Sequence, residues 1–347
     1  MLGFPDPSCG SNLNLASGTS SPLISANYPG NYPSFHYCSW KFTARNHLPA
    51  VSQRSDSPDI LAGKRCRFME SRSVDCGVSQ SGGGAGRRSG MSKRSDPASG
   101  IDRIIGGTPV PSQLKYPWMA WMVNASGQFT CGGSLINDRY VLTAAHCVSS
   151  NPSGTFMVTL GDLDRSTSTE SRSIQVAATA IVHPGFDAPT SLNNDVALLK
   201  LTTPVDFNAN PNIRPICISS AAVPNPGDTV TIAGWGRVAE QQDPVSSVLL
   251  ETNATVIDSK TCQSWFGNDA NDNFFCAQNA GKNICNGDAG GPVMFRTSNG
   301  TVLNVGINSF VIKGCFTQFG GAYVKTANYV DSFIKSNTAD ALWCPAA

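Results

Sequence analysis

The chain has 347 residues, which is long enough for two domains or for one large domain with appendages. Only 14% of the residues are charged and the formal net charge is +1, so neither nucleic acid nor an anionic membrane surface is indicated as a partner. Its 33 glycines, 22 prolines and many short apolar runs favour a β-rich, turn-dense protein, and the sequence predicts no membrane span.

The chain contains 12 cysteines without a CxxC pair, which predicts a disulfide framework and therefore secretion into an oxidising compartment. Asn-X-Ser/Thr sequons at Asn124, Asn253 and Asn299 agree with export. The first residues, Met1 to Cys9, lack the basic patch and apolar core of a signal peptide, so we expect a leader upstream of them. No metal or cofactor is expected.

Residues 1–46 hold Cys9 and Cys38 around the string Ile24-Ser-Ala-Asn-Tyr-Pro-Gly-Asn-Tyr-Pro33, which precedes Tyr37-Cys-Ser-Trp40. These strings resemble the first half of a CUB domain, and the resemblance implies a Cys9–Cys38 pair. Half of a β-sandwich leaves an unpaired sheet edge. We therefore expect a partial CUB-like β segment. The resemblance implies no calcium site, because the acidic positions with which many CUB domains bind calcium lie mostly in the half that is missing here.

Residues 47–103 are rich in Ser, Arg and Gly, a composition that predicts a flexible linker or propeptide. The basic sites Arg87-Arg88, Lys93-Arg94 and Arg103 lie in this strip. Basic pairs in an exposed flexible segment are targets for proteases.

Residues 104–347 contain short apolar runs separated by Gly, Pro, Asn and Asp, the pattern of many antiparallel strands. Clear examples are residues 140–144, 195–201 and 230–233. A helix is expected near the C-terminus, with Val330, Phe333 and Ile334 on one face after a capping Asn328.

Three strings in this region follow one another in chain order: Leu142-Thr-Ala-Ala-His-Cys147, Asp195-Val-Ala-Leu-Leu and Gly287-Asp-Ala-Gly-Gly-Pro292. A fourth, Ile104-Ile-Gly-Gly107, follows a basic residue. Together they resemble the chymotrypsin-like serine peptidases, whose triad runs His, Asp, Ser. The resemblance implies an all-β fold of two six-stranded antiparallel barrels with a C-terminal helix.

The resemblance also implies a role for each matching residue. His146 is similar to the general base, and Asp195 to the buried carboxylate that orients the imidazole. Ser309 is similar to the serine that helps to hold that carboxylate. The backbone N–H groups of Gly287 and residue 289 match the oxyanion hole.

The bond between Arg103 and Ile104 matches the activation bond of the family, so a trypsin-like protease is implied as the activating partner. Cleavage would free the α-amine of Ile104 to pair with an acidic residue, here Asp288. A buried ion pair is stable only with good geometry, and this dependence suits a switch that orders the oxyanion loop.

The chain departs from the family at Ala289, where the nucleophilic serine is expected. Without a hydroxyl no acyl-enzyme can form. Two interpretations remain open: a natural non-catalytic homologue, or a serine-to-alanine variant of a working protease. The natural homologue is favoured by the truncated CUB-like start and an unusual pocket, whereas the intact His146 and Asp195 favour the variant.

The resemblance places Asn283 at the base of the specificity pocket, with Val311 and Gly321 on its walls. A neutral Asn offers no counter-charge to a lysine or arginine side chain, which would lose its water there. Val311 stands where the family usually has glycine and should narrow the entrance. We expect a preference for small or medium neutral side chains.

The family pattern implies the disulfides Cys131–Cys147, Cys262–Cys276 and Cys285–Cys315. Cys76-Gly-Val resembles the start of a chymotrypsinogen-like propeptide, whose cysteine would pair with Cys217. Cys66 and Cys344 are left to pair with each other, link to another chain or remain free.

Three hypotheses follow from the sequence. The first is a secreted, zymogen-type protease homologue that binds proteins or peptides after a cut at Arg103. The second is a serine endopeptidase, if the native residue 289 is serine. The third is a matrix or receptor adaptor that uses its CUB-like segment.

Overall fold

The computed structural model describes residues 76–79, 104–167, 169, 171–239 and 245–343, together with strands β1 (Asn12–Leu13) and β2 (Lys41–Phe42). β1 and β2 pair in parallel. They belong to the unit Met1–Met69, and the remaining elements belong to the unit Glu70–Ala347. The rest of the predicted CUB-like segment lies outside the described residues, as do Cys9, Cys38, Cys66, Arg103 and Cys344.

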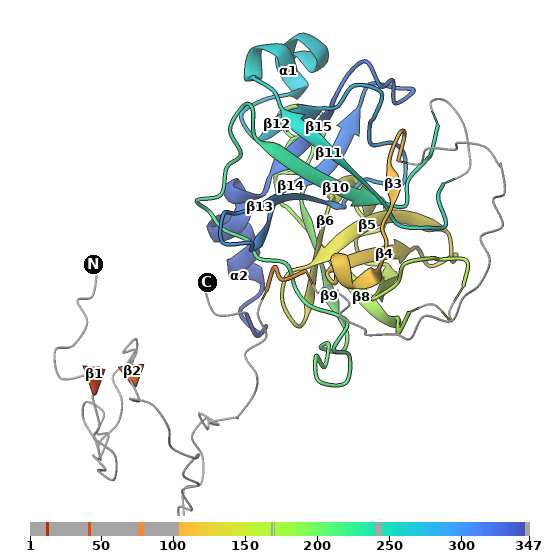
Figure 1. Cartoon of the computed structure of the whole chain (residues 1–347), viewed down its shortest axis with the longest axis vertical. Coiled ribbons are helices and arrows are strands. Elements are labelled where there is room, and N and C mark those ends of the chain that lie inside the picture. The colour runs from red at the N-terminus through yellow and green to blue at the C-terminus, as the bar shows by residue number, and fades with distance from the viewer. Residues whose placement is uncertain are drawn as a thin grey trace, which may run out of the picture. The chain divides into compact units, whose positions relative to one another are not determined.

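The first part of the larger unit is a closed antiparallel barrel with the strand order β4-β5-β6-β9-β8-β7 (Figure 1). Its strands are β4 (Met119–Val123), β5 (Phe129–Leu135), β6 (Tyr140–Thr143), β7 (Thr155–Leu160), β8 (Ile174–Val182) and β9 (Ala197–Leu201). The apolar runs at 140–144 and 195–201 thus contain β6 and β9, as predicted.

The second part is a sheet with the order β10-β13-β14-β15-β12-β11, closed into a barrel by the pairing of β10 with β11. The short strand β3 (Thr108–Pro109) adds to β11. The barrel strands are β10 (Thr229–Gly234), β11 (Leu250–Val256), β12 (Phe274–Gln278), β13 (Pro292–Arg296), β14 (Val302–Val311) and β15 (Gly321–Lys325). The predicted fold of two six-stranded antiparallel barrels is confirmed.

The main hydrophobic core is shared by both barrels. It contains Leu142 and Leu198 from the first barrel, Phe274 and Val324 from the second, and Phe333 from the C-terminal helix, all at most 4% exposed. In a strand with one buried face, buried and more exposed side chains alternate along the chain. Strand β11 shows this pattern, with every second side chain buried: Leu250, Thr252, Ala254 and Val256. Because one core joins the barrels, residues far apart in sequence keep fixed positions across their junction.

The helical segment at the C-terminus has three parts: a 3-10 helix (Thr326–Tyr329), a π-helical turn (Val330–Ile334) and α2 (Lys335–Asn337). The predicted face of Val330, Phe333 and Ile334 is buried. The predicted cap is wrong, because the helix begins directly after β15 and places Asn328 inside its first turn. The Asn328 amide instead donates to Oδ1 of Asn273 at 3.0 Å.

The other helical elements are too short for the hydrophobic periodicity of the sequence to reveal them. Helix α1 (Ser259–Phe266) is capped by Asp258, whose carboxylate accepts the N–H of Thr261 at 2.9 Å. Single 3-10 turns cover Gln113–Lys115, Ala145–Cys147 and Gly267–Asp269. Among the described helices none is long and apolar enough to cross a membrane.

Residues 338–343 run from α2 back onto the first barrel and hold it to the second. The Asp340 carboxylate accepts the Tyr140 hydroxyl at 2.6 Å and pairs with Lys200 at 2.8 Å. Asp138 accepts the N–H of Leu342 at 2.7 Å. The hydrogen bonds to Lys200 and Tyr140 lower the pKa of Asp340 to about 2.

Among the described residues of the larger unit, four disulfides are formed: Cys76–Cys217, Cys131–Cys147, Cys262–Cys276 and Cys285–Cys315. They are the four pairs that the family resemblance implied for these cysteines. Around Cys76 the backbone is also paired, since Gly77 donates to Pro215 O at 3.0 Å and accepts from Val302 N–H at 2.8 Å. Residues 76–79 are therefore attached to the barrels by both a covalent bond and hydrogen bonds.

The Cys76–Cys217 bond predicts that cleavage after Arg103 leaves the N-terminal segment attached. Protein cut by a trypsin-like enzyme should run as one band near full size without reductant and as two bands with it. Cuts at Arg87-Arg88 or Lys93-Arg94 leave this outcome unchanged, because both sites lie between Cys76 and Arg103. The control is the double variant Cys76→Ser and Cys217→Ser, and two separate bands from the unaltered protein before reduction would contradict the prediction.

The Asp340 contacts predict a stability difference that depends on pH. Since the folded pKa is depressed, the ionised carboxyl stabilises the fold above its ordinary pKa, and this stabilisation is lost as pH falls towards 2. Asp340→Asn should lower the Tm at pH 6, and the difference from the unaltered protein should shrink between about pH 4 and pH 2. Thermal unfolding followed by circular dichroism measures this, with Asp269→Asn as a control at an exposed carboxyl. An equal Tm at pH 6 would show that the contact does not stabilise the fold.

Candidate functional site

A cavity of about 910 Å³ is lined by segments of both barrels, and five of the predicted site residues line it: His146, Gly287, Ala289, Ser309 and Val311. The first barrel contributes Thr130, Cys131, His146 and Cys147. The second contributes Arg237, residues 284–287, Ala289, residues 309–311 and residues 313–316. A cavity at the junction of two rigid barrels is suited to hold an extended ligand against both.

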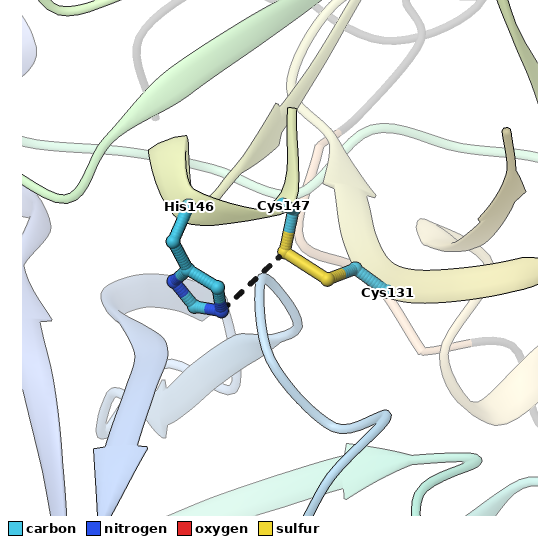
Figure 2. A group of neighbouring side chains, drawn as sticks. All are labelled: Cys131, His146 and Cys147. Atoms are coloured by element: carbon cyan, nitrogen blue, oxygen red, sulfur yellow. Dashed lines mark hydrogen bonds between the residues drawn. A yellow bond between two sulfur atoms is a disulfide. The ribbon is translucent and has the colours of Figure 1, made fainter. Parts of the chain in front are cut away.

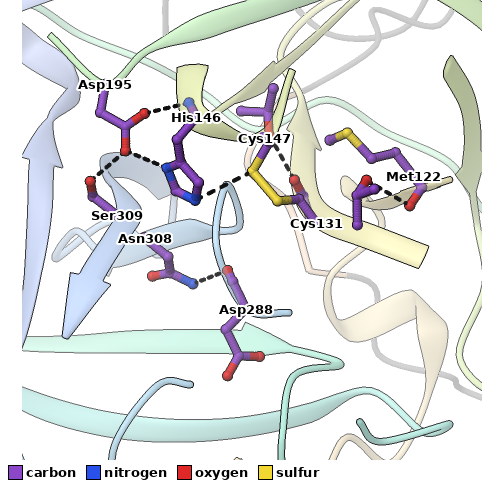
Figure 3. Close-up of a disulfide and its surroundings, with 11 residues drawn as sticks. Met122, Cys131, His146, Cys147, Asp195, Asp288, Asn308 and Ser309 are labelled. Carbon is purple, nitrogen blue, oxygen red and sulfur yellow. Dashed lines mark hydrogen bonds and ion pairs between the residues drawn. A yellow bond between two sulfur atoms is a disulfide. The ribbon is translucent and has the colours of Figure 1, made fainter. Parts of the chain in front are cut away.

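His146, Asp195 and Ser309 are brought together from three separate elements (Figure 3). His146 lies in the turn after β6, Asp195 two residues before β9, and Ser309 in β14. Oδ2 of Asp195 lies 2.8 Å from His146 Nδ1 and accepts the Ser309 hydroxyl at 2.5 Å, while Oδ1 accepts the backbone N–H of His146 at 2.8 Å. The carboxylate holds Nδ1 protonated, which leaves Nε2 as the basic nitrogen.

The electrostatic balance at His146 is set by burial and by Asp195. Burial acts to lower the pKa of His146, but the hydrogen bond and the charge of Asp195 outweigh it and raise the pKa above the ordinary 6.5. Asp195 is fully buried, whereas the His146 side chain is 30% exposed. The imidazole can therefore accept a proton from a group in the cavity and hold it as an imidazolium beside a fixed negative charge.

The loop of residues 285–291 presents Ala289 to this cavity. The hydrogen bonds that fix the loop include Gly132 N–H to Ala289 O at 2.9 Å, Gly290 N–H to Asn308 O at 2.8 Å, and Asn308 Nδ2 to Asp288 O at 2.8 Å. Gly287 has a φ of +98°, a conformation that a side chain would strain. Within the described part of the chain, the N–H groups of Gly287 and Ala289 have no acceptor. They remain available to a ligand oxygen.

Asp288 points away from the cavity into a fully buried space. Its carboxyl accepts the N–H of Gly236 at 2.8 Å and that of Cys285 at 2.9 Å. Burial raises the pKa of Asp288 to about 7, although these two hydrogen bonds act to lower it. A Cβ on Gly236 would come within 2.4 Å of the carboxyl, so glycine is required there.

Ile104 is also fully buried, and the neighbouring Ile105 accepts the N–H of Asn283 at 3.2 Å. The segment after the predicted activation bond is thus attached to the stretch of chain that leads into the Asp288 loop. Arg103 itself lies outside the described residues.

The three residues predicted to form the specificity pocket do not all line the cavity. Val311 lines the cavity, but Asn283 and Gly321 are not among its lining residues. The Asn283 amide is held by Phe316 O and Phe319 O, each at 3.2 Å. Gly321 lies against Tyr323 and against Ile284, which does line the cavity.

The sulfur atoms of Cys131 and Cys147 lie beside the His146 ring, with Cys147 Sγ 3.8 Å from Nε2 (Figure 2). Three such groups could suggest a metal site. The two sulfur atoms are bonded to each other, however, and a disulfide offers no thiolate to a metal ion.

Sequence reasoning did not single out three residues that shape the site. Asn308 anchors the Asp288 loop through its amide, and Arg237 and Lys313 line the cavity. Position alone could have drawn attention to them, since Asn308 precedes Ser309, Arg237 follows Gly234-Trp-Gly236, and Lys313 lies two residues before Cys315.

Comparison with known proteins identifies a matching family model and several similar proteins. The family model described as trypsin matches residues 104–333. Trypsin II-P29 of Gallus gallus is 34% identical over 232 residues, which cover 66% of this chain and 87% of that protein. CLIP domain-containing serine protease B4 of Anopheles gambiae is 32% identical over 309 residues, covering 81% of this chain and 82% of the relative. The proclotting enzyme of Tachypleus tridentatus is 33% identical over 250 residues, or 66% of this chain and 64% of that enzyme.

The contact between Asp195 and His146 predicts a titration change. Asp195→Asn removes the negative charge, so burial should act alone and the pKa of His146 should fall below 6.5. The imidazole C–H resonances followed by NMR against pH measure this, with His183 as the internal control. Burial already lowers the pKa of His183, which should not change in the variant. An unchanged pKa at His146 would contradict the assigned balance.

Proposed function

Because this chain belongs to the trypsin family, we propose that it is an extracellular, zymogen-type peptidase homologue that binds peptides without cleaving them. Proteins of this family bind peptide substrates. The observation that carries the proposal is the methyl group of Ala289, which lines the cavity together with His146. Ser309 and Gly287 line the same cavity as this methyl group.

The contacts support the roles that we propose for these residues. His146 is the general base, Asp195 and Ser309 hold it, and the N–H groups of Gly287 and Ala289 form the oxyanion hole. With no nucleophile at residue 289, no covalent intermediate can form. Loss of the serine in a protease of another fold lowers kcat by about 10⁶-fold, whereas binding and oxyanion contacts persist.

Activation is proposed to occur by cleavage between Arg103 and Ile104. In the uncut chain Asp288 is buried with two N–H donors, and burial opposes its ionisation. A new α-amine at Ile104 would supply the missing counter-charge and strengthen the hold on the 285–291 loop. The activating partner is then a protease that cuts after arginine.

Location outside the cell is supported by the four disulfides among the described residues. It is also consistent with two sequons at accessible positions. Asn253 is exposed on β11, and Asn299 is exposed in the turn between β13 and β14. Both side chains are proposed to carry N-linked glycans.

The second candidate function is a serine endopeptidase, which applies if the native gene encodes serine at residue 289. The complete hydrogen bonding of His146, Asp195 and Ser309 favours it, since a site without activity has no need of that geometry. The genomic codon for residue 289 separates the two candidates directly.

The experiment that tests the proposal restores the hydroxyl. The unaltered protein, cut after Arg103, should hydrolyse no peptide amide, and Ala289→Ser cut in the same way should gain amidase activity. Activity should favour neutral side chains before the scissile bond over lysine and arginine, because no acidic side chain lines the cavity within the described residues. The peptide that the revertant cleaves should bind to the unaltered protein with a Kd close to its Kd for the revertant. The reason is that the added hydroxyl acts mainly in the transition state.

The matched control is the double variant Ala289→Ser with His146→Ala, which should stay inactive because the base is absent. Turnover by the unaltered protein that serine-directed inhibitors abolish would overturn the proposal. An inert revertant with a free Ile104 terminus would mean that residue 289 is not the only defect.

A further inference from the structure

The residue directly before Asp195 has an unusual backbone conformation. Asn194 has a φ of +53°, in the left-handed region that residues other than glycine rarely adopt. Its carbonyl oxygen accepts the N–H of Val196 at 2.7 Å, so the chain turns tightly around Asp195. A residue keeps such a conformation only where neighbouring contacts hold it. The contacts that hold Asn194 therefore help to set the direction in which the Asp195 side chain leaves the backbone.

The Asn194 side chain is bonded at both ends of its amide. Nδ2 donates to the carbonyl oxygen of Gly185 at 2.8 Å, within the same loop of the first barrel. Oδ1 accepts the hydroxyl of Tyr329 at 3.0 Å and Nδ2 of Asn273 at 3.4 Å. Asn273 directly precedes β12, and Tyr329 ends the 3-10 helix that follows β15. The amide of Asn194 thus joins the loop before β9 to two segments beyond the first barrel.

Asn193 repeats this arrangement one residue earlier. Its side chain is buried, and Nδ2 donates to the carbonyl oxygen of Ala188 at 2.7 Å. Its Oδ1 accepts Nδ2 of Asn273 at 3.0 Å and Nδ2 of Asn271 at 3.1 Å. Asn273 therefore donates to both residues that precede Asp195. We call Asn193, Asn194, Asn271 and Asn273 the asparagine network.

Backbone partners fix the direction of each bond in the asparagine network. The amide nitrogens of Asn193 and Asn194 face backbone carbonyl oxygens, which can only accept. Their Oδ1 atoms therefore face donors, and these donors come from the second barrel and the C-terminal segment. The backbone N–H of Asn273, which can only donate, faces Oδ1 of Asn271 at 2.9 Å and leaves the Asn271 nitrogen for Asn193. The network is thus a directed connection towards the loop that carries Asp195.

The connection ends at the carboxylate that orients His146. Asp195 is fully buried, and its bonds to His146 and Ser309 are strong only while the groups stay aligned. Burial raises the pKa of Tyr329 and the charge of Asp195 raises it further, so the Tyr329 hydroxyl lies within reach of that charge. A change at Asn194 therefore acts on the contact between Asp195 and His146.

We propose that Asn273 and Tyr329 are positioning residues, which orient Asp195 through Asn194 and thereby maintain the basicity of His146. The inference rests on the roles proposed for His146 and Asp195 and adds to them two residues from outside the first barrel. Ser309 holds the carboxylate directly, whereas Asn273 and Tyr329 hold the backbone from which the carboxylate extends. Both kinds of contact depend on the way in which the two barrels meet.

Two variants remove the proposed contacts. Tyr329→Phe is the milder one, because the ring stays in place and only the hydroxyl that bonds Asn194 is lost. Asn273→Ala removes the donations to both Asn193 and Asn194. Each variant is made in the full unaltered chain and again together with Ala289→Ser, and all proteins are cut after Arg103.

The first measurement is the pKa of His146, from the imidazole C–H resonances followed by NMR against pH and assigned with His146→Ala. The pKa should fall by about 0.5 in Tyr329→Phe and by about 1 in Asn273→Ala. The reason is that a misaligned carboxylate gives a weaker hydrogen bond and leaves the effect of burial less opposed.

The second measurement is amidase activity in the Ala289→Ser background. Each variant should lower kcat by about tenfold and leave KM unchanged, since the orientation of the base matters in the transition state and not for binding. A residue that only stabilises the fold would not give this separation of kcat from KM.

The matched control is Tyr140→Phe, which removes another tyrosine hydroxyl that joins the first barrel to the C-terminal segment, through Asp340. It should lower the Tm but leave the pKa of His146 and kcat unchanged. Thermal unfolding verifies that every variant is folded at the temperature of the measurements.

The outcomes separate this inference from the proposed function. A lower Tm with an unchanged pKa of His146 in both Tyr329→Phe and Asn273→Ala would assign them a structural role and overturn the inference. An equal fall of the pKa in Tyr140→Phe would overturn it as well. If the Ala289→Ser protein is inert, the titration of the unaltered chain and its variants still decides the inference, because it needs no turnover.

Discussion

The buried carboxylate of Asp195 is the interaction on which the site depends. A fully buried charge is costly unless several donors surround it, and here the donors come from both barrels. His146 supplies two of them from the first barrel and Ser309 supplies one from the second. The two barrels must therefore meet in one arrangement for this charge to be satisfied, and the cavity is formed where they meet.

The 285–291 loop shows how the same junction supports binding without a nucleophile. The loop is held through its backbone and by the Asn308 amide, so a serine hydroxyl at residue 289 is not needed to keep its shape. An alanine there removes the reacting atom and little else. What remains is a preformed cavity in which, within the described part of the chain, the N–H groups of Gly287 and Ala289 have no acceptor.

Much of the fold could be predicted from the sequence, because short apolar runs between turn residues mark strands wherever the periodicity is local. The runs at 140–144 and 195–201 are examples, and the buried face of Val330, Phe333 and Ile334 is another. Predictions that depended on non-local contacts were less successful. Asn328 was predicted to cap the C-terminal helix, but the helical segment begins directly after β15, two residues before Asn328. The assignment of Asn283 to the pocket base stays a prediction: its amide donates to Phe316 O and Phe319 O, and Phe316 lines the cavity.

The sequence by itself determined the family resemblance, the order of His146, Asp195 and Ala289, and the loss of the hydroxyl, because these depend only on which residue stands at which position. Only the tertiary structure decided which side chains share the cavity. Arg237 and Lys313 are 76 residues apart, and neither belongs to a recognisable motif. They line one cavity because a backbone hydrogen bond and a disulfide attach their segments to the same loop, and such long-range contacts leave no periodic signal in the chain.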